Sequence, residues 1–349
     1  MAKGNVVVIG AAGQIGRAAV GALARDGWEV TAASRGGGLD DAWPAGVRTV
    51  RLDRADDAAL AAVVGDGCDV VVDLVAYDGE HADQLAALAA AGRVGSAVVV
   101  SSAAVYEDDR GRGFDTQAEP EGAPRYPVPI PESQRTVAPG GGSYSTRKAR
   151  LEQRLAAAGE VLPATVLRAG AVHGAHCRAP RELYFVKRVL DGRSHRVLSY
   201  GGASRFHTAH VSNIAELIRL AARRPGSRVL NAVDPDAPSV AEIAAAIDAV
   251  MGSDTRTVLM EGTPGADGVG DTPWSLPYPM VQDMTAAERE LGYRPVTDYA
   301  ASLPETVAFL TARLADHGDW RDAFPVMRRS YGEGLFDYAA EDAWLAGRN

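Results

Sequence analysis

The sequence has little cysteine and no long apolar run. Cys68 and Cys177 are the only two cysteines among 349 residues, so we expect no disulfide framework and a reducing, cytoplasmic location. No apolar run approaches the ~20 residues that span a bilayer. The N-terminal residues also lack the charged and apolar regions of a secretory signal. The sequence therefore predicts a soluble chain that does not bind membranes.

A basic stripe is missing as well. The formal net charge is −9, from 36 Lys and Arg against 45 Asp and Glu, and the basic residues are scattered. This distribution argues against a nucleic-acid partner, but it says little about the ligand. The expected partner is a small, polar substrate. Hydrophobic residues make up 46% of the chain, an ordinary value for a globular protein that can bury a core.

The first half of the chain alternates two patterns. Short β-branched or apolar runs predict buried strands, and Ala-rich stretches between them predict helices. The expected strands are 6–9, 29–33, 47–52, 70–74, 97–101 and 164–167, and the expected helices are 16–24, 55–64, 82–91 and 143–157. This rhythm predicts βαβ units in a doubly wound parallel Rossmann sheet, followed by a smaller C-terminal α/β substrate domain.

The rest of the chain is less regular. Residues 111–142 are rich in Pro, Gly and charge and predict a long loop, either functional or disordered, and 260–281 predict an excursion over the surface. Later helices are expected at 181–190, 211–222, 240–250 and 304–314. We expect a dinucleotide-binding domain over 1–175 with a crossing segment near 205–235, an interleaved substrate domain over 176–317, and an aromatic tail over 318–349. The tail aromatics are expected to pack on the protein body or on a subunit partner.

A glycine turn follows the first expected strand. Gly10, Gly13 and Gly16 are spaced G-x-x-G-x-x-G, with Gln14 and Ile15 opening the next helix. Such a turn brings free backbone N–H groups and the positive end of a helix toward a pyrophosphate. Packing between strand and helix is the alternative explanation. The position of the turn favours binding of a dinucleotide.

The second expected strand ends without a carboxylate. Ser34 and Arg35 stand where an acidic residue would hold the ribose hydroxyls of NAD. The guanidinium of Arg35 is suited to a 2′-phosphate, so NADP is the expected cofactor, with NAD as the alternative. Asp53, after the third strand, is either a contact to the adenine amino group or the N-cap of the helix expected from Ala55.

A proton-transfer group is expected on one helix face. Tyr144 and Lys148 are four residues apart, and Ser102 ends a strand at the edge where open α/β sheets bind ligands. An ammonium and an oxidised nicotinamide would both lower the pKa of the phenol toward neutrality. We therefore expect Tyr144 to act as acid and base, Lys148 to assist it and to hold the cofactor ribose, and Ser102 to hold the substrate oxygen.

With these residues in place, the chain resembles extended short-chain dehydrogenases/reductases of the NAD-dependent epimerase/dehydratase family. The resemblance rests on the glycine turn, Val99–Tyr106, the Tyr144/Lys148 pair, 167–174, His210–Ala215 and Leu291–Pro295. It implies that the backbone of Ala171 and Val172 meets the nicotinamide amide, and that Leu74 and Ala76 line the cofactor channel. It also implies a homodimer through two helices of the Rossmann side.

Departures from the family pattern bear on the substrate. Ala103 and Ala104 follow Ser102 where 4,6-dehydratases carry an acidic residue, so dehydration is not expected. Arg205 stands one residue too far from His210 to match the family's phosphate-contacting arginine, which weakens the case for a nucleotide diphosphate-sugar. The expected substrate residues are Ala103, His173, His176, Arg205 and His207. No metal site is expected, because no ligand spacing fits one.

Three functions stay open on the sequence. The first is an NAD(P)-dependent oxidoreductase, a carbonyl reductase acting on an alcohol or ketone carbon of a polar, sugar-like metabolite. The second is a nucleotide-sugar epimerase that keeps its cofactor bound. The third is a cofactor-binding regulator without catalytic activity, which the intact serine, tyrosine and lysine disfavour.

Overall fold

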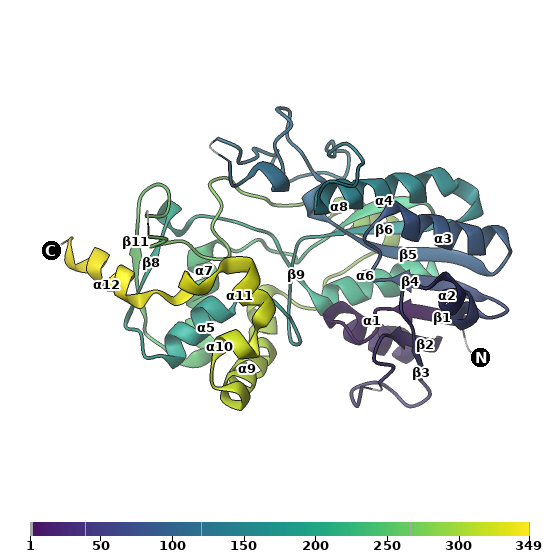
Figure 1. Ribbon diagram of the computed structural model, residues 1–349, viewed down its shortest axis with the longest axis horizontal. Coiled ribbons are helices and arrows are strands. Elements are labelled where there is room, and N and C mark those ends of the chain that lie inside the picture. Colours follow the sequence, from purple (N-terminus) through teal and green to yellow (C-terminus); the bar gives the residue numbers. More distant parts are fainter. Residues whose placement is uncertain (1–2, 39, 120, 266, 349) are drawn as a thin grey trace. The chain divides into compact units, whose positions relative to one another are not determined.

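A computed structural model describes residues 3–38, 40–119, 121–265 and 267–348 (Figure 1). The chain forms two compact units, each made of three segments. The first unit contains Met1–Gly170, Val211–Val233 and Gln282–Val296, and the second contains Ala171–His210, Asp234–Val281 and Thr297–Asn349.

A seven-stranded sheet forms the centre of the first unit, with the order β10-β6-β5-β4-β1-β2-β3. Every pair of neighbours is parallel. Its strands are β1 (Asn5–Ile9), β2 (Glu29–Ser34), β3 (Arg48–Arg51), β4 (Cys68–Asp73), β5 (Val94–Ser102), β6 (Ala164–Ala169) and β10 (Arg228–Ala232). The predicted doubly wound Rossmann sheet is confirmed. The chain leaves β3 and returns beside β1 as β4, so the winding reverses there, at the position where such sheets bind ligands.

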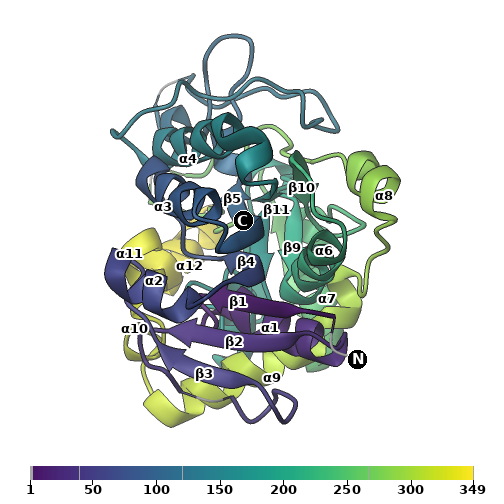
Figure 2. The same cartoon turned by 90° about the vertical axis from the view of Figure 1, so that its right-hand side faces the viewer.

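Helices cover both faces of this sheet. They are α1 (Gln14–Arg25), α2 (Asp57–Val64), α3 (Gly79–Ala90), α4 (Tyr144–Ala158), α6 (Val211–Arg223) and α8 (Thr285–Leu291). In Figure 2, α2, α3 and α4 lie on one face and α1 and α6 on the other, with α3 against α4 and α1 against α6. Alternating valines of the strands and the alanine and leucine faces of the helices form the core between the layers.

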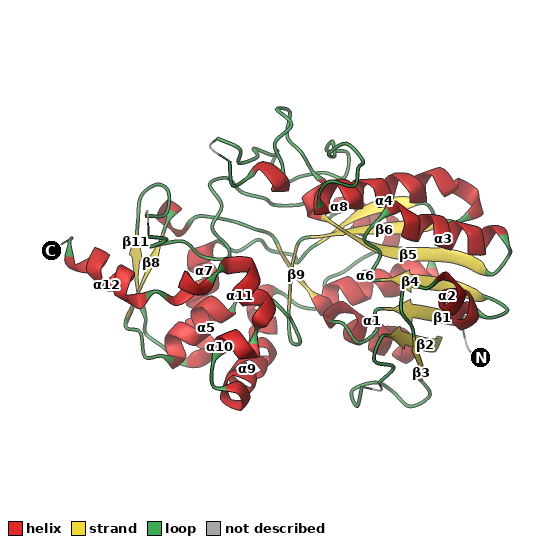
Figure 3. Cartoon of the chain, in the orientation of Figure 1, coloured by secondary structure: helices red, strands yellow, loops and turns green. Residues whose placement is uncertain are grey.

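The second unit combines short strand pairs with helices (Figure 3). Strands β7 (Ala171–His173) and β9 (Thr208–His210) form one parallel pair, and β8 (His195–Leu198) and β11 (Arg256–Leu259) form another. The helices are α5 (Leu183–Leu190), α7 (Val240–Met251), α9 (Tyr299–His317), α10 (Trp320–Ala323), α11 (Pro325–Tyr331) and α12 (Tyr338–Ala346). Short 3-10 turns occur in the first unit at η1 (Ala103–Val105), η2 (Phe114–Thr116) and η3 (Gly159–Val161), and in the second at η4 (Tyr200–Gly202) and η5 (Glu333–Phe336).

The C-terminal segment packs on the second unit. Trp320 and Phe324 are fully buried in its core. Glu341, in α12, is also buried: its carboxylate accepts from Arg188 Nη1 at 2.5 Å and from the Val197 backbone N–H at 2.9 Å. The expectation that the tail aromatics pack on the protein body is met by Trp320 and Phe324.

The expectation for residues 260–281 is wrong. Met260, Val269 and Trp274 are buried, and Trp274 is only 1% exposed. The carbonyl of Gly270 accepts from the Ser199 N–H at 2.9 Å, which holds the segment against the second unit. Glycine and proline shape the backbone here, but the apolar side chains between them make the segment part of a core. Within the described ranges, no helix is long and apolar enough to cross a membrane.

Candidate active site

The glycine turn closes tightly onto the sheet. Gly10 has φ +87°, and its N–H and that of Ala11 donate to the Ala33 carbonyl at 2.9 and 3.1 Å. A Cβ on Gly16 would lie 2.3 Å from the Gly10 oxygen, so only glycine allows this contact between helix and turn. The packing explanation weighed for the motif therefore holds for Gly16.

Gly13 has a different role, because it faces outward as the N-cap of α1. A Cβ there would meet only the Gly10 oxygen, at 3.1 Å. Helix α1 has no side-chain cap and no acidic residue in its first turn, which contains Gln14 and Ile15. By contrast, α2, α4 and α7 are capped by Asp56, Ser143 and Ser239. A positive helix end without a cap fits the pyrophosphate of a dinucleotide.

The loop after β2 presents a cation. Ser34 accepts the Gly37 N–H through its carbonyl at 3.2 Å and its hydroxyl at 3.1 Å, which turns the chain away from the sheet. Arg35 follows in an exposed position. Among the residues that the structure describes, no hydrogen bond or ion pair engages its side chain. Arg17 on α1, in contrast, pairs with Asp40.

Asp53 is not a helix cap. Its carboxylate accepts the Ala55 N–H at 3.1 Å, but α2 begins at Asp57 and Asp56 caps it through the Ala59 N–H. The N-cap alternative is wrong because Asp56 stands directly before the first helical residue. The exposed Asp53 carboxylate stays a predicted adenine contact.

Lys148 is buried beside Tyr144 on α4. Its ammonium donates to the carbonyls of Ala76 at 2.5 Å and Val100 at 2.9 Å, and lies 5.9 Å from the centre of the Tyr144 ring. Burial lowers the pKa of Lys148 to about 8, although the nearby carboxylates of Asp73 and Glu152 act in the opposite direction. The lysine thus titrates within the range in which a catalytic group is useful.

Ser102 and Tyr144 meet through their hydroxyls. Burial raises the pKa of the Tyr144 phenol, and a hydrogen bond with the Ser102 side chain partly opposes this rise. The Ser102 hydroxyl also accepts the Ala104 N–H at 3.1 Å, which fixes it at the start of η1. The protein's own groups therefore leave the pKa of the phenol above its ordinary value, contrary to the lowering expected from Lys148, because burial outweighs the favourable contacts.

A residue that the sequence did not single out braces the start of α4. Asp115, in η2 of the long 107–142 segment, accepts from the hydroxyls of Ser143 at 2.5 Å and Ser145 at 2.9 Å. These two serines flank Tyr144 in the chain. The 107–142 segment therefore supports the helix that carries the phenol, and no local pattern in the sequence signals this contact.

The other end of the segment is held by Asp108. This buried carboxylate accepts the N–H groups of Arg110, Arg112 and Arg125 at 2.8 to 3.0 Å and pairs with the Arg112 guanidinium. These donors hold the pKa of Asp108 well below its ordinary value despite burial. The chain between Arg112 and Arg125 is thus closed at its base.

The candidate cofactor-channel residues follow β4. The Leu74 N–H donates to the Ile9 carbonyl at 3.1 Å, so this turn starts beside the glycine turn. Ala76 is fully buried, and its carbonyl holds Lys148. The first unit therefore brings the glycine turn, Leu74, Ala76, Ser102, Tyr144 and Lys148 to one edge of its sheet.

The second unit contains the remaining predicted residues. On β7, the Ala171 N–H donates to the His207 carbonyl at 2.8 Å, and Val172 pairs with Ala209 of β9. His173 and His207 are buried, and both contact Asp234: the His173 ring meets its carboxylate at 2.7 Å and the His207 ring meets its carbonyl at 3.0 Å.

His176 and Arg205 lie nearer the surface. His176 is exposed and has φ +63°, and the centre of its ring lies 5.0 Å from that of Phe309, with the two rings tilted. The Arg205 guanidinium contacts the Ala237 carbonyl and lies 3.4 Å from Glu242. Ala103 is buried in η1. The substrate roles of these residues stay predictions. No cluster of metal-ligating side chains occurs in the described part of the chain.

Comparison with known proteins decides the family. The profile described as the NAD dependent epimerase/dehydratase family matches residues 6–232. The chain belongs to this family. The matched residues contain the glycine turn, Ser102, Tyr144 and Lys148. No curated protein sequence matches the chain.

Solved structures of the epimerase/dehydratase type share the fold. One is UDP-N-acetylglucosamine 4-epimerase from Methanobrevibacter ruminantium in complex with UDP-N-acetylmuramic acid (TM-score 0.69, 20% identity, 90% of this chain and 100% of that one). A second is the Bordetella bronchiseptica enzyme WbmH in complex with NAD+ (0.67, 18%, 90% and 99%). A third is MoeE5 in complex with UDP-glucose and NAD (0.64, 22%, 89% and 100%).

Proposed function

We propose that this protein is an NAD(P)-dependent oxidoreductase that moves hydride to or from an alcohol or ketone carbon of a polar metabolite, working mainly as a carbonyl reductase. One observation carries the proposal: Ser102, Tyr144 and Lys148 lie together at the carboxyl ends of the sheet strands, where the glycine turn also lies. The family membership and the helix end without a cap support a dinucleotide cofactor.

Each side chain has one role in this proposal. The nicotinamide cofactor supplies or accepts the hydride. Tyr144 holds a proton at its hydroxyl and gives it to the substrate oxygen in reduction, or takes it in oxidation. Ser102 orients that oxygen through its hydroxyl. Lys148, held by two carbonyls, contributes positive charge near the phenol and a donor for the cofactor ribose.

The choice of cofactor depends on the loop after β2. The exposed Arg35 cation favours the 2′-phosphate of NADP. Against this, structures with the same fold were solved with NAD, including WbmH and MoeE5. We propose binding of both dinucleotides, with NADP bound more tightly.

A nucleotide-sugar epimerase is the second candidate. It is favoured by the solved structures of similar fold that are named as UDP-sugar 4-epimerases. The surroundings of Arg205 speak against it, because its guanidinium contacts the Ala237 carbonyl and Glu242 instead of standing ready for a diphosphate. A regulator that binds the cofactor without turning over a substrate is the third candidate.

We also propose that the protein is a homodimer. Light scattering, which gives the mass in solution, tests this.

Two assays on the same purified protein separate these functions. A reductase consumes reduced nicotinamide when ketones are added, and Tyr144→Phe abolishes the loss of absorbance. An epimerase isomerises a UDP-sugar without net cofactor turnover. Tyr331→Phe, which removes a half-buried phenol of the C-terminal segment, is the matched control and should keep full activity. Binding of dinucleotide without either reaction would leave only the regulator.

A further inference from the structure

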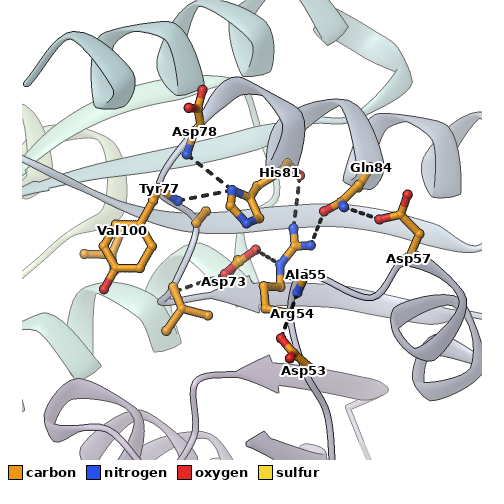
Figure 4. A network of polar contacts seen from close by, with 12 residues as sticks. Asp53, Arg54, Ala55, Asp57, Asp73, Tyr77, Asp78, His81, Gln84 and Val100 are labelled. Carbon is orange, nitrogen blue, oxygen red and sulfur yellow. Dashed lines mark hydrogen bonds and ion pairs between the residues drawn. The ribbon is translucent and has the colours of Figure 1, made fainter. Parts of the chain in front are cut away.

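A buried ion pair lies between α2 and the carboxyl end of β4. Arg54 Nε donates to Asp73 Oδ2 at 2.7 Å; Asp73 is fully buried and Arg54 is 7% exposed (Figure 4). Burying two charges costs much of what their attraction returns, so such a pair contributes little net stability. Its position between the predicted adenine contact Asp53 and the turn at 74–78 suggests a functional reason for it.

The pair ties this turn to α3. Asp73 Oδ1 accepts the Val75 N–H at 3.0 Å, which fixes the first bend after β4. Arg54 also donates to the His81 carbonyl at 3.1 Å and to Gln84, both on α3. In Figure 4 the guanidinium of Arg54 lies between these partners. The turn cannot shift without breaking these contacts.

The same turn holds Lys148. The Ala76 carbonyl accepts from the ammonium at 2.5 Å, while the Val100 carbonyl on β5 accepts at 2.9 Å. Further along the turn, the Asp78 carboxylate accepts from Arg150 Nε of α4 at 2.6 Å. The location of the ammonium is therefore set by the turn as much as by α4.

Charges reach Lys148 from each neighbouring element. Asp73 acts from β4 and Glu152 from α4, while the Tyr77 and Tyr144 rings lie 5.1 and 5.9 Å from its ammonium. Each carboxylate already has a cationic partner: Glu152 binds Arg168, also at 2.7 Å, and Asp73 binds Arg54. Both nevertheless favour the charged lysine against the effect of burial.

We propose that Arg54 and Asp73 are a positioning pair for Lys148: together they fix the turn that bears the Ala76 carbonyl, and the Asp73 carboxylate favours the charged ammonium beside Tyr144. The inference rests on the proposed function, because that function gives the charge of Lys148 its role beside Tyr144. Its physical content, the dependence of Lys148 on the pair, can be tested in the protein without cofactor.

The chain suits a direct test because it has three lysines, Lys3, Lys148 and Lys187. Protein labelled with ¹³C at the lysine Cε carbons gives one titrating signal per lysine, and Lys3→Arg and Lys187→Arg assign them. Lys3 pairs with Asp26 in the first unit and Lys187 with Asp191 in the second. Their signals report whether each variant is folded.

The two partners should act in opposite directions. Asp73→Asn removes the carboxylate and leaves the Arg54 cation, so the pKa of Lys148 should fall from about 8 by about one unit. Arg54→Gln removes the cation that pairs with the Asp73 carboxylate, so the pKa of Lys148 should rise. Unchanged values, or a rise in both variants as entry of water into a loosened turn would give, overturn the proposal. If Asp73→Asn does not fold, Arg54→Gln/Asp73→Asn removes both charges and should still lower the pKa.

A control and a kinetic readout complete the test. Asp248→Asn breaks a similarly buried pair with Arg196 in the second unit and should leave the Lys148 signal unchanged. In the active enzyme, the alkaline limb of the pH–rate profile should move with the Lys148 pKa in each variant. If Tyr144→Phe kept its activity, the proposed function would fail while the NMR result stood; if the NMR signal did not move, only the pairing inference would fail.

Discussion

Replacing Lys148 by methionine should make the protein more stable at neutral pH although it removes a proposed catalytic group. The difference between a pKa of about 8 and the ordinary 10.5 corresponds to about 3 kcal/mol for keeping the buried ammonium charged at pH 7. Methionine of similar length avoids this cost. It loses the two hydrogen bonds to Ala76 and Val100, worth about 1 kcal/mol each. The variant should therefore be about 1 kcal/mol more stable at pH 7.

The difference in free energy of unfolding between the wild type and Lys148→Met should change sign as the pH rises. Between about 8 and 10.5 the unfolded lysine binds a proton that the folded one has lost, so the wild-type free energy of unfolding rises with pH relative to the variant. At about 1.4 kcal/mol per pH unit, the two proteins become equally stable near pH 9, and at pH 10 the wild type is about 1 kcal/mol more stable.

Chemical denaturation at half-unit steps from pH 7 to 10 measures this difference. Lys187→Met, which removes an ammonium on α5 that pairs with Asp191, is the control and should not follow the same curve. A Lys148→Met difference that stays constant across this range would refute the argument that a buried, titrating ammonium lies at this position.

Three further substitutions test the site and the fold. Tyr144→Phe should lower turnover by about 10²- to 10⁴-fold while the dissociation constant of the cofactor, measured by calorimetry, stays nearly unchanged; equal turnover would remove the phenol from the mechanism. Arg35→Ala should weaken NADP about tenfold or more and NAD little, since a charge-assisted contact is lost; equal losses would argue against a 2′-phosphate contact. Glu341→Gln should lower the free energy of unfolding by about 3 kcal/mol, because Arg188 is left as a buried cation without its partner. Asp342→Asn, at an exposed position, should lower it by under about 1 kcal/mol. Thermal unfolding compares the two variants, and similar losses of stability would contradict the anchoring of α12.

Local patterns predicted the parts of this molecule that depend on local physics. The strands of the Rossmann sheet follow from short β-branched runs, and the Tyr144/Lys148 face follows from helical spacing. Helix boundaries were less exact: α2 begins two residues after the expected Ala55, because Asp56 caps it. Six strands of the Rossmann sheet and most of its helices could thus be predicted from the sequence, with errors of a few residues at the ends, whereas β10 and α8 were not predicted.

Contacts between distant segments could not be predicted in this way. Arg54 and Asp73 are 19 residues apart and Asp115 lies 28 residues before Ser143, and no periodicity links either pair. A charged residue in a sequence is expected at the surface, so burial of Asp73 goes against the usual preference. The expectation for 260–281 was wrong for another reason: it rested on the glycine and proline content, which does not show that apolar side chains such as Trp274 are buried.

The hydrogen bonds that the Asp108 carboxylate accepts have a practical consequence for engineering. This one carboxylate accepts from the backbone on both sides of the 112–125 excursion and closes it at its base, while Asp115 within the excursion contacts the start of α4. A short peptide tag or a fluorescent reporter inserted between Gln117 and Ala118, both outside regular helix and strand, should leave folding intact. The excursion thus offers a ready attachment point close to the start of α4 for watching ligands arrive.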